Sequence, residues 1–214
     1  MLAAGVITLL AACASVEDSS RSPKHRPLSA SEGRALVSQL LPDNVRDKAG
    51  WATDMYAAIA ALDIPPTADN LCAAIAVTGQ ESGFQVDPAV PGLAGLARKE
   101  IDKRREEAGV PWLALEAALA LPSTNGKSYG ERLQAVKTEQ QLSDIYEDFI
   151  GRVPFGKSLL ADRNPVRTGG PMQVSVAFAE SFRAARPYPY PVTNDMRHEV
   201  FTRRGGVYFG IAHL

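Results

Sequence analysis

The chain has 214 residues, of which 45% are hydrophobic and 22% are charged, and its formal net charge at pH 7 is −1. This composition is typical of a globular protein rather than a disordered one, and the length is sufficient to bury a core. Because nucleic-acid-binding domains usually carry an excess of basic residues, the near-neutral charge argues against nucleic acid as a partner.

The N-terminus has the features of an export signal. Residues 2–12 form an apolar run, too short to span a bilayer as a permanent helix, and Cys13 follows it directly. Small residues before a cysteine resemble the bacterial lipobox, which implies a signal peptide over residues 1–13 and a lipid anchor on Cys13. No Lys or Arg precedes the apolar run, unlike in most such signals, and an ordinary secretory peptide is the alternative.

The next segment, residues 14–30, is rich in Ser and Pro without an apolar period, which predicts a flexible linker. The absence of an Asp beside Cys13 resembles the pattern of lipoproteins sorted to the outer membrane, so we expect a lipid-anchored protein of the cell envelope, facing the periplasm. The second cysteine, Cys72, lies among apolar residues and is expected to be a buried thiol without an intrachain partner.

The body of the chain, residues 31–214, has a helical pattern. Ser29 with Glu32 forms a capping-box sequence, and Pro42 is expected to end the first helix. The next helix has an apolar stripe, and Asp69 or Asn70 is expected to cap the third. The stripe of the second helix is Trp51, Met55, Ile59 and Leu62, and that of the third is Leu71, Cys72, Ile75 and Ala76.

Further helices are predicted around residues 95–107, 111–121, 128–137 and 139–150. A turn with a short strand is predicted at 167–176, followed by a helix, then by a helix capped by Asn194, and by a last one from 205 onward. The sequence therefore predicts a mainly α (α+β) fold with a small β element. No signal for a stop follows the last helix, so we expect the chain to be truncated at its C-terminus.

Two motifs match patterns whose structural context is missing. Residues 151–158, "GRVPFGKS", fit the phosphate-loop pattern, but a helical pattern precedes them where a strand is needed, so we expect a plain loop and no nucleotide. "HEVFT", from His198, begins like a zinc-protease helix but has Thr202 where the second His is required. We expect no metal site and no cofactor.

Glu81 is the candidate catalytic residue. Gly83 is a natural residue for the position after a helix, which places Glu81 in the last helical turn. Both the negative end of the helix dipole and burial among apolar neighbours would raise the pKa of this carboxyl. An acid kept protonated near neutral pH is suited to donate a proton to a glycosidic oxygen, although a glutamate at a frayed helix end is the alternative.

Three blocks of the sequence resemble the soluble lytic transglycosylases and goose-type lysozymes. "GQESGFQVDPA" (79–89) is similar to their catalytic helix end, "GGPMQVSV" (169–176) to their Gly-Leu-Met-Gln strand, and "GVYFGIAHL" (206–214) more weakly to a later helix. Here Pro171 replaces the Leu, a long insertion separates the first two blocks, and the family's Ala-Tyr-Asn motif has no match up to Leu214. Lipid anchoring is common among the membrane-bound members of this family.

The resemblance implies a lysozyme-like domain over residues 31–214 that cleaves the glycan strands of peptidoglycan between N-acetylmuramic acid and N-acetylglucosamine. Glu81 would act first as acid and then as base, and an anhydro-muramic product would form without a second carboxylate. The residues implied in substrate binding are Ser82, Met172, Gln173 and Tyr208. As a second acid, Asp87 and Glu180 are not distinguished by the sequence.

Three alternatives remain open at this point. The first is a lipoprotein that binds peptidoglycan without cleaving it, and the second is an envelope-assembly factor that uses its apolar helices to bind partners. The third is a hydrolase of the lysozyme type, in which water attacks and a reducing end is formed. The sequence does not distinguish cleavage at chain ends from cleavage inside strands.

Overall fold

The computed structural model describes residues 26–214, which fold into α-helices and one small hairpin. The elements are α1 (Ala30–Leu40), α2 (Lys48–Ala61), α3 (Ala68–Ser82), α4 (Leu93–Glu107), α5 (Trp112–Ala120), α6 (Tyr129–Ala135), α7 (Glu139–Arg152), α8 (Gly156–Leu160), the 3₁₀ turn η2 (Ala161–Arg163), β1 (Thr168–Gly169), β2 (Val174–Ser175), α9 (Val176–Ala185), α10 (Met196–Val200) and α11 (Arg203–His213). The mainly helical fold with a small β element is confirmed.

Most helix boundaries follow from local capping chemistry. Ser29 and Glu32 form the expected capping box, and α1 ends at Leu40, before Pro42. The caps expected for two other helices were wrong by a few residues at most. Thr67, rather than Asp69 or Asn70, caps α3, and Asp195, rather than Asn194, caps α10.

The main core lies between α1, α2, α3, α9, α10, α11 and the hairpin. The stripe predicted for α2 is buried in it, and the largest side chains come from α2 and α11. The largest members with almost no exposed surface are Val37, Trp51, Met55, Ile59, Leu71, Val200, Val207, Tyr208 and Phe209. This one cluster therefore joins the N-terminal helices to the C-terminal helix.

The face that α3 buries differs from the predicted one. Leu71, Ala74, Thr78 and Ser82 face the core, whereas Cys72 is exposed, so its prediction as a buried thiol was wrong. All residues from Leu71 to Gly79 are small or apolar, so the sequence marks several possible stripes and the neighbouring helices select one.

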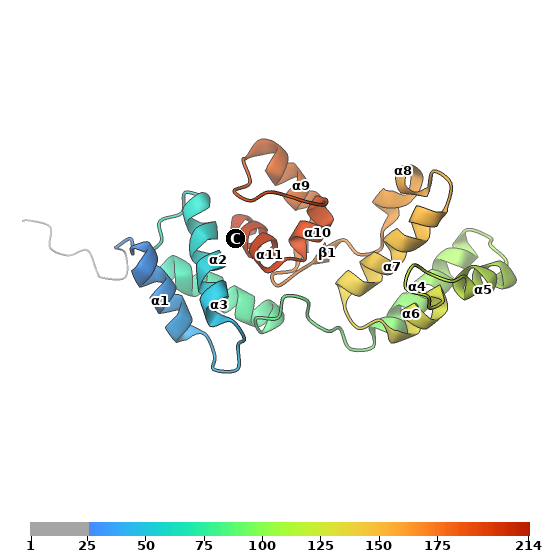
Figure 1. Ribbon diagram of the computed structural model, residues 1–214, viewed down its shortest axis with the longest axis horizontal. Coiled ribbons are helices and arrows are strands. Elements are labelled where there is room, and N and C mark those ends of the chain that lie inside the picture. The colour runs from blue at the N-terminus through green and yellow to red at the C-terminus, as the bar shows by residue number, and fades with distance from the viewer. Residues whose placement is uncertain (1–25) are drawn as a thin grey trace, which may run out of the picture.

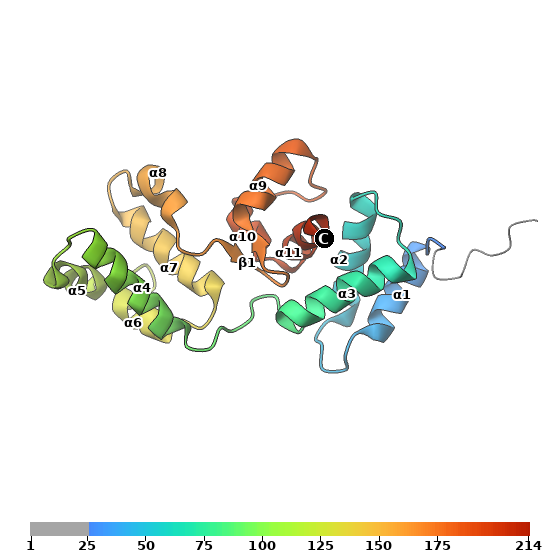
Figure 2. The ribbon, with the colours of Figure 1, turned by 180° about the vertical axis from the view of Figure 1, so that it is seen from behind.

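α4 to α8 pack mainly on one another and make a separate part of the molecule. Figures 1 and 2 show them gathered at one end, α1 to α3 at the other end, and α9 to α11 between the two. Their own buried residues include Leu93, Ala97, Tyr129, Leu133 and Ile150. This part lies between the first two sequence blocks, and we refer to α4–η2 as the inserted lobe and to the remainder as the body.

The body and the inserted lobe meet where the chain crosses between them. The loop after α3 pairs with the start of α7, through a bridge between Ala89 and Thr138 and a hydrogen bond from the Val90 amide to the Lys137 carbonyl at 2.8 Å. On the other side, the Arg197 guanidinium of α10 contacts the carboxylate of Glu147 in α7, with Nε 3.5 Å from Oε1. The described residues contain no helix long and apolar enough to cross a membrane.

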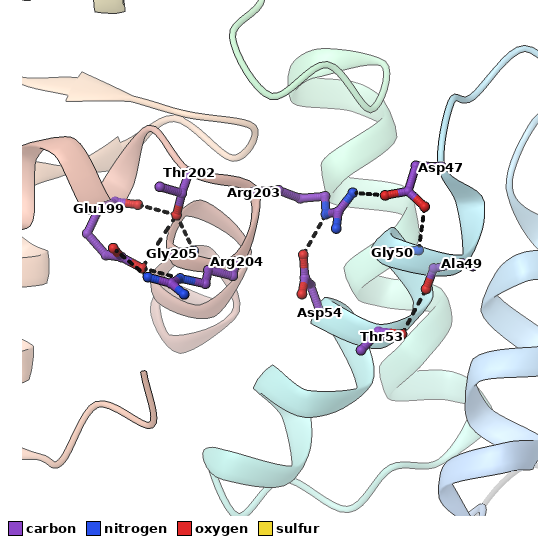
Figure 3. A network of polar contacts seen from close by, with 10 residues as sticks. All are labelled: Asp47, Ala49, Gly50, Thr53, Asp54, Glu199, Thr202, Arg203, Arg204 and Gly205. Carbon is purple, nitrogen blue, oxygen red and sulfur yellow. Dashed lines mark hydrogen bonds and ion pairs between the residues drawn. The ribbon is translucent and has the colours of Figure 1, made fainter. Parts of the chain in front are cut away.

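Arg203, the first residue of α11, fixes this helix against α2. Figure 3 shows its guanidinium between Asp47 and Asp54, with N–O distances of 2.6 Å and 2.5 Å. The guanidinium also lies over the Trp51 ring, 5.7 Å from its centroid. These contacts join residues 149 and 156 positions apart in the chain and hold the last helix in the core.

Candidate functional site

Glu81 lies in the last turn of α3, as the sequence predicted. Gly83 follows with φ 57° and ends the helix in the left-handed region, where a residue without Cβ carries no strain. The side chain of Glu81 is exposed, so the prediction that it is buried among apolar neighbours was wrong. Within residues 26–214 its carboxylate makes no hydrogen bond or ion pair, so it is free to meet a ligand.

The residue after Gly83 turns the chain back onto the body. Phe84 has φ 63°, and its ring packs edge-on against Trp51 with centroids 5.6 Å apart. It also lies close to Gly79, where a Cβ would come within 3.3 Å of the ring. The Phe of the quoted block thus anchors the end of α3, which fixes the place of Glu81.

Ser82 and Tyr208 face the interior. The Ser82 hydroxyl donates to the Thr78 carbonyl one turn earlier, at 3.1 Å, and does not contact Glu81. Tyr208 is 0% exposed and its hydroxyl donates to the Pro187 carbonyl at 3.5 Å. Neither side chain offers a surface to a substrate here, and both support the core instead, because α11 is the central helix of the body.

Met172 also packs inward, in the turn between β1 and β2. It lies against Gly210 of α11, where a Cβ would be 2.6 Å from the Met172 sulfur. The glycine of the third block therefore makes room for the methionine of the second. This contact explains why two blocks far apart in sequence occur in one fold.

Gln173, in the turn of the hairpin, is partly exposed. It has φ 50°, and its side-chain oxygen accepts a hydrogen bond from the Thr168 hydroxyl at 3.3 Å. The carboxyl of Glu139, in the first turn of α7, lies near this amide, which lowers the pKa of that carboxyl. The hairpin of the body and the first turn of α7 thus meet at this amide.

Glu139 is the functional candidate that the sequence did not indicate. Burial raises the pKa of its carboxyl, the nearby Gln173 amide opposes this, and the negative charge of Asp87 adds to the rise. No motif surrounds Glu139, and only the pairing of residues 89–90 with 137–138 brings Asp87 close to it. The one available signal was an acidic residue directly after a helix cap.

Of the two residues named as a second acid, Asp87 lies in this group. Glu180 is exposed on α9 and makes no hydrogen bond or ion pair within residues 26–214. The structure therefore brings together Asp87, Glu139 and Gln173 where body and lobe meet. Glu81 is on the same connection, six residues before Asp87, but it is not joined to the group by a hydrogen bond or ion pair. Carboxyls of different environment around one amide can serve proton transfer and the binding of sugar hydroxyls.

The phosphate-loop match has the surroundings of an ordinary turn. α7 precedes it, the five-residue α8 follows it, and no strand of the described chain adjoins it. His198 lies in α10, close to Asp195 and Glu147. One ring nitrogen of His198 and one carboxylate oxygen from each of the two acids lie within 4.8 Å of one another, so the three could hold a metal ion. The expectation of no metal site rested on spacing along the sequence, which does not reveal such a group.

A cavity of about 450 Å³ opens in the inserted lobe, between α4, α5 and α6. Its polar lining includes Arg98, which is paired with both Asp102 and Glu116. Trp112 and Leu113, at the start of α5 in the same lobe, have exposed side chains. Neither Glu81 nor the Asp87–Glu139–Gln173 group lines this cavity.

Comparison with known proteins gives a family and one curated relative. The relative is "Uncharacterized protein YaiW" of Escherichia coli (strain K12), 44% identical over 208 residues, which cover 97% of this chain and 56% of the relative. The chain thus spans little more than half of that protein's length. No solved structure matches. A family model described as "Protein of unknown function (DUF1615)" matches residues 44–214, and the chain therefore belongs to the DUF1615 family.

Proposed function

We propose that this protein cleaves the glycan strands of peptidoglycan as a lytic transglycosylase, with Glu81 as its acid and base. The observation that carries the proposal is the placement of Glu81. Its carboxylate is exposed in the last turn of α3, is fixed by the left-handed Gly83 and the anchored Phe84, and has no partner among the described residues. A general acid must reach a ligand, and this one is not held by another group.

The exposure of Glu81 makes the bound substrate part of the mechanism. A substrate that covers the site would remove water from around the carboxyl, and such desolvation favours the protonated form that a general acid requires. The partial negative charge at the C-terminal end of α3 acts in the same direction. Glu81 would then protonate the glycosidic oxygen as the bond breaks, and its carboxylate would take the proton of the muramic primary hydroxyl, whose oxygen closes the anhydro ring.

Support for a glycan substrate also comes from the group of polar side chains where the body and the inserted lobe meet. Asp87, Glu139 and Gln173 offer carboxyl and amide groups from three segments, which is the chemistry that hydrogen-bonds sugar hydroxyls and amides. In the proposal this group binds the substrate, and Gln173 keeps the role that the resemblance implied. Met172 and Tyr208 support the hairpin and α11 from inside.

The test is mass spectrometry of peptidoglycan incubated with the protein, beside Glu81→Gln and the control Glu107→Gln. Glu107 is an exposed glutamate at the end of α4, far along the inserted lobe. We expect anhydro-muropeptides from the parent and the control, and a loss of at least about 100-fold in Glu81→Gln, the order found when a general acid is removed. Full activity of Glu81→Gln would refute the mechanism.

The products distinguish the remaining functions. Reducing ends in place of anhydro ends would show a hydrolase. If no variant releases soluble products but the protein co-sediments with peptidoglycan, it is a binding protein, and retention of neither property would favour an assembly factor. These outcomes are separable because binding and cleavage are measured on the same samples.

We further propose that the protein is anchored in the outer membrane through Cys13, which lies outside the described residues together with most of the linker. Palmitate labelling of the parent and of Cys13→Ser, followed by membrane fractionation, tests this. The proposal fails if both incorporate label equally or if neither does.

A further inference from the structure

The junction of body and inserted lobe holds a group of metal-ligating side chains apart from the proposed cleavage site. Glu147 comes from α7 of the lobe, and Asp195 and His198 come from the first turn of α10 in the body. One ligand atom from each lies within 4.8 Å of the others. The group is therefore formed by the tertiary structure, from residues about fifty positions apart.

The imidazole is oriented as a ligand. Its Nδ1 lies 2.8 Å from Oδ1 of Asp195, which also accepts from the backbone amide of His198 at 2.9 Å as the cap of α10. A carboxylate on Nδ1 favours the tautomer with its proton there, which leaves the Nε2 lone pair free. Nε2 points toward Glu147, 3.7 Å from its Oε2.

The distance between Nε2 of His198 and Oε2 of Glu147 suits an ion bound to both atoms. Tetrahedral zinc with bonds of about 2.0–2.1 Å holds two ligand atoms roughly 3.4 Å apart. The observed 3.7 Å requires only a small side-chain adjustment. The Asp195 carboxylate stays on Nδ1, at the other side of the ring, where it orients the imidazole, and water would complete the coordination.

The surrounding charges favour a cation. Asp144 of α7 adds its negative charge to those of Glu147 and Asp195, while Arg197 contacts Glu147 through the other oxygen, Oε1, at 3.5 Å. Burial raises the pKa of Glu147 and the negative charges of Asp195 and Asp144 add to the rise, whereas His198 and Arg197 oppose it. Burial opposes protonation of His198, but the hydrogen bond and charges of its carboxylate neighbours raise its pKa overall. The carboxylates of Glu147, Asp195 and Asp144 outnumber the two guanidinium groups near them, Arg197 and Arg132, so an excess of negative charge remains.

We propose that Glu147 and His198, with Asp195 as the group that orients the imidazole, bind one divalent transition-metal ion such as Zn²⁺, which clamps the inserted lobe to the body. Imidazole with carboxylate is a ligand set that suits zinc. The ion would fix the separation of α7 and α10. It would thereby also hold Glu139, in the first turn of α7, near Asp87 in the loop after α3. This inference does not depend on the proposed cleavage reaction.

The test is titration of chelator-treated protein with zinc chloride by isothermal calorimetry at pH 7. All proteins carry Cys72→Ser, because the exposed Cys72 thiol could bind zinc by itself. We expect one ion per chain, at least about tenfold weaker binding in Glu147→Gln, and loss of binding in His198→Ala. The control is His213→Ala, whose ring packs on Phe178 at the end of α11.

Two further measurements keep the result decisive if a variant is unstable. Circular dichroism checks that each variant is folded, and visible absorption of Co²⁺-loaded protein reports whether a nitrogen–oxygen tetrahedral site forms. Zinc binding that is equal in parent, Glu147→Gln and His198→Ala would overturn the proposal. So would no binding to the parent, in which case the group is an ion pair of a protonated His198 with its neighbours.

Discussion

Replacing Glu199 should destabilise the body strongly, because its carboxylate is the centre of a buried polar network. The side chain is 5% exposed, and it accepts from the Tyr188 hydroxyl at 2.6 Å and from Nε of Arg204 at 2.8 Å. Burial alone would raise the pKa of Glu199, but the hydrogen bonds from Arg204 and Tyr188 lower it overall. The group is therefore ionised and paired inside the fold.

The loss in Glu199→Ala follows from what remains behind. Tyr188 keeps a partly buried hydroxyl without its acceptor, and Arg204 keeps a charge without its partner. The Arg204 side chain is 34% exposed, so water can hydrate part of it. We therefore expect a loss of about 3 kcal/mol in the free energy of unfolding, the lower end of the range for breaking a buried pair. In a chain of this size that lowers Tm by roughly 6–12 °C.

Urea unfolding followed by circular dichroism measures this loss, with Glu180→Ala on the surface of α9 as control. The control should change the free energy of unfolding by less than about 0.5 kcal/mol. Glu199→Gln retains an acceptor for Tyr188 but not the charge, and should lie between the two. If Glu199→Ala is as stable as the control, the cost of desolvating the pair cancels its attraction, and the reasoning is refuted.

Two more predictions concern the hairpin and its carboxyl neighbour. Gly170→Ala should lower the free energy of unfolding by about 2–4 kcal/mol for two reasons. An alanine is strained at this positive φ, and its Cβ would lie 2.1 Å from the Val200 carbonyl oxygen. Gly126→Ala, with positive φ but open space around it, should cost only about 1 kcal/mol, and equal losses in urea unfolding would contradict the steric argument. Because the pKa of Glu139 is higher in the folded than in the unfolded protein, ionisation of this carboxyl destabilises the fold. The destabilisation is absent below the unfolded pKa and grows as the pH rises to the folded pKa. Glu139→Gln should therefore have a higher Tm than the parent at pH 7, a gain that vanishes below about pH 4, and a lower Tm at pH 7 would show that the carboxylate stabilises the junction instead.

The sequence alone determined the helices and much of their placement. Capping residues such as Ser29 and the helix-ending Gly83 act within a few positions of the chain, so their effect can be inferred without knowing the fold. The stripe from Trp51 to Leu62 predicted a buried face correctly, because large apolar residues there alternate with small or polar ones. The position of Glu81 at a helix end followed from the same local rules.

Only the tertiary structure decided which small residues are buried and which polar groups meet. α3 has too little contrast between its faces for the sequence to choose between Cys72 and Ala74, so packing against α1 and α2 made the choice. Glu81 proved exposed and Tyr208 buried because exposure depends on what covers a helix, which local patterns do not contain. The meeting of Glu139 with Gln173, and of Glu147 with His198, depends on how the inserted lobe folds back onto the body. Contacts between residues so distant in sequence are set by the packing of whole helices, and no spacing along the chain encodes them.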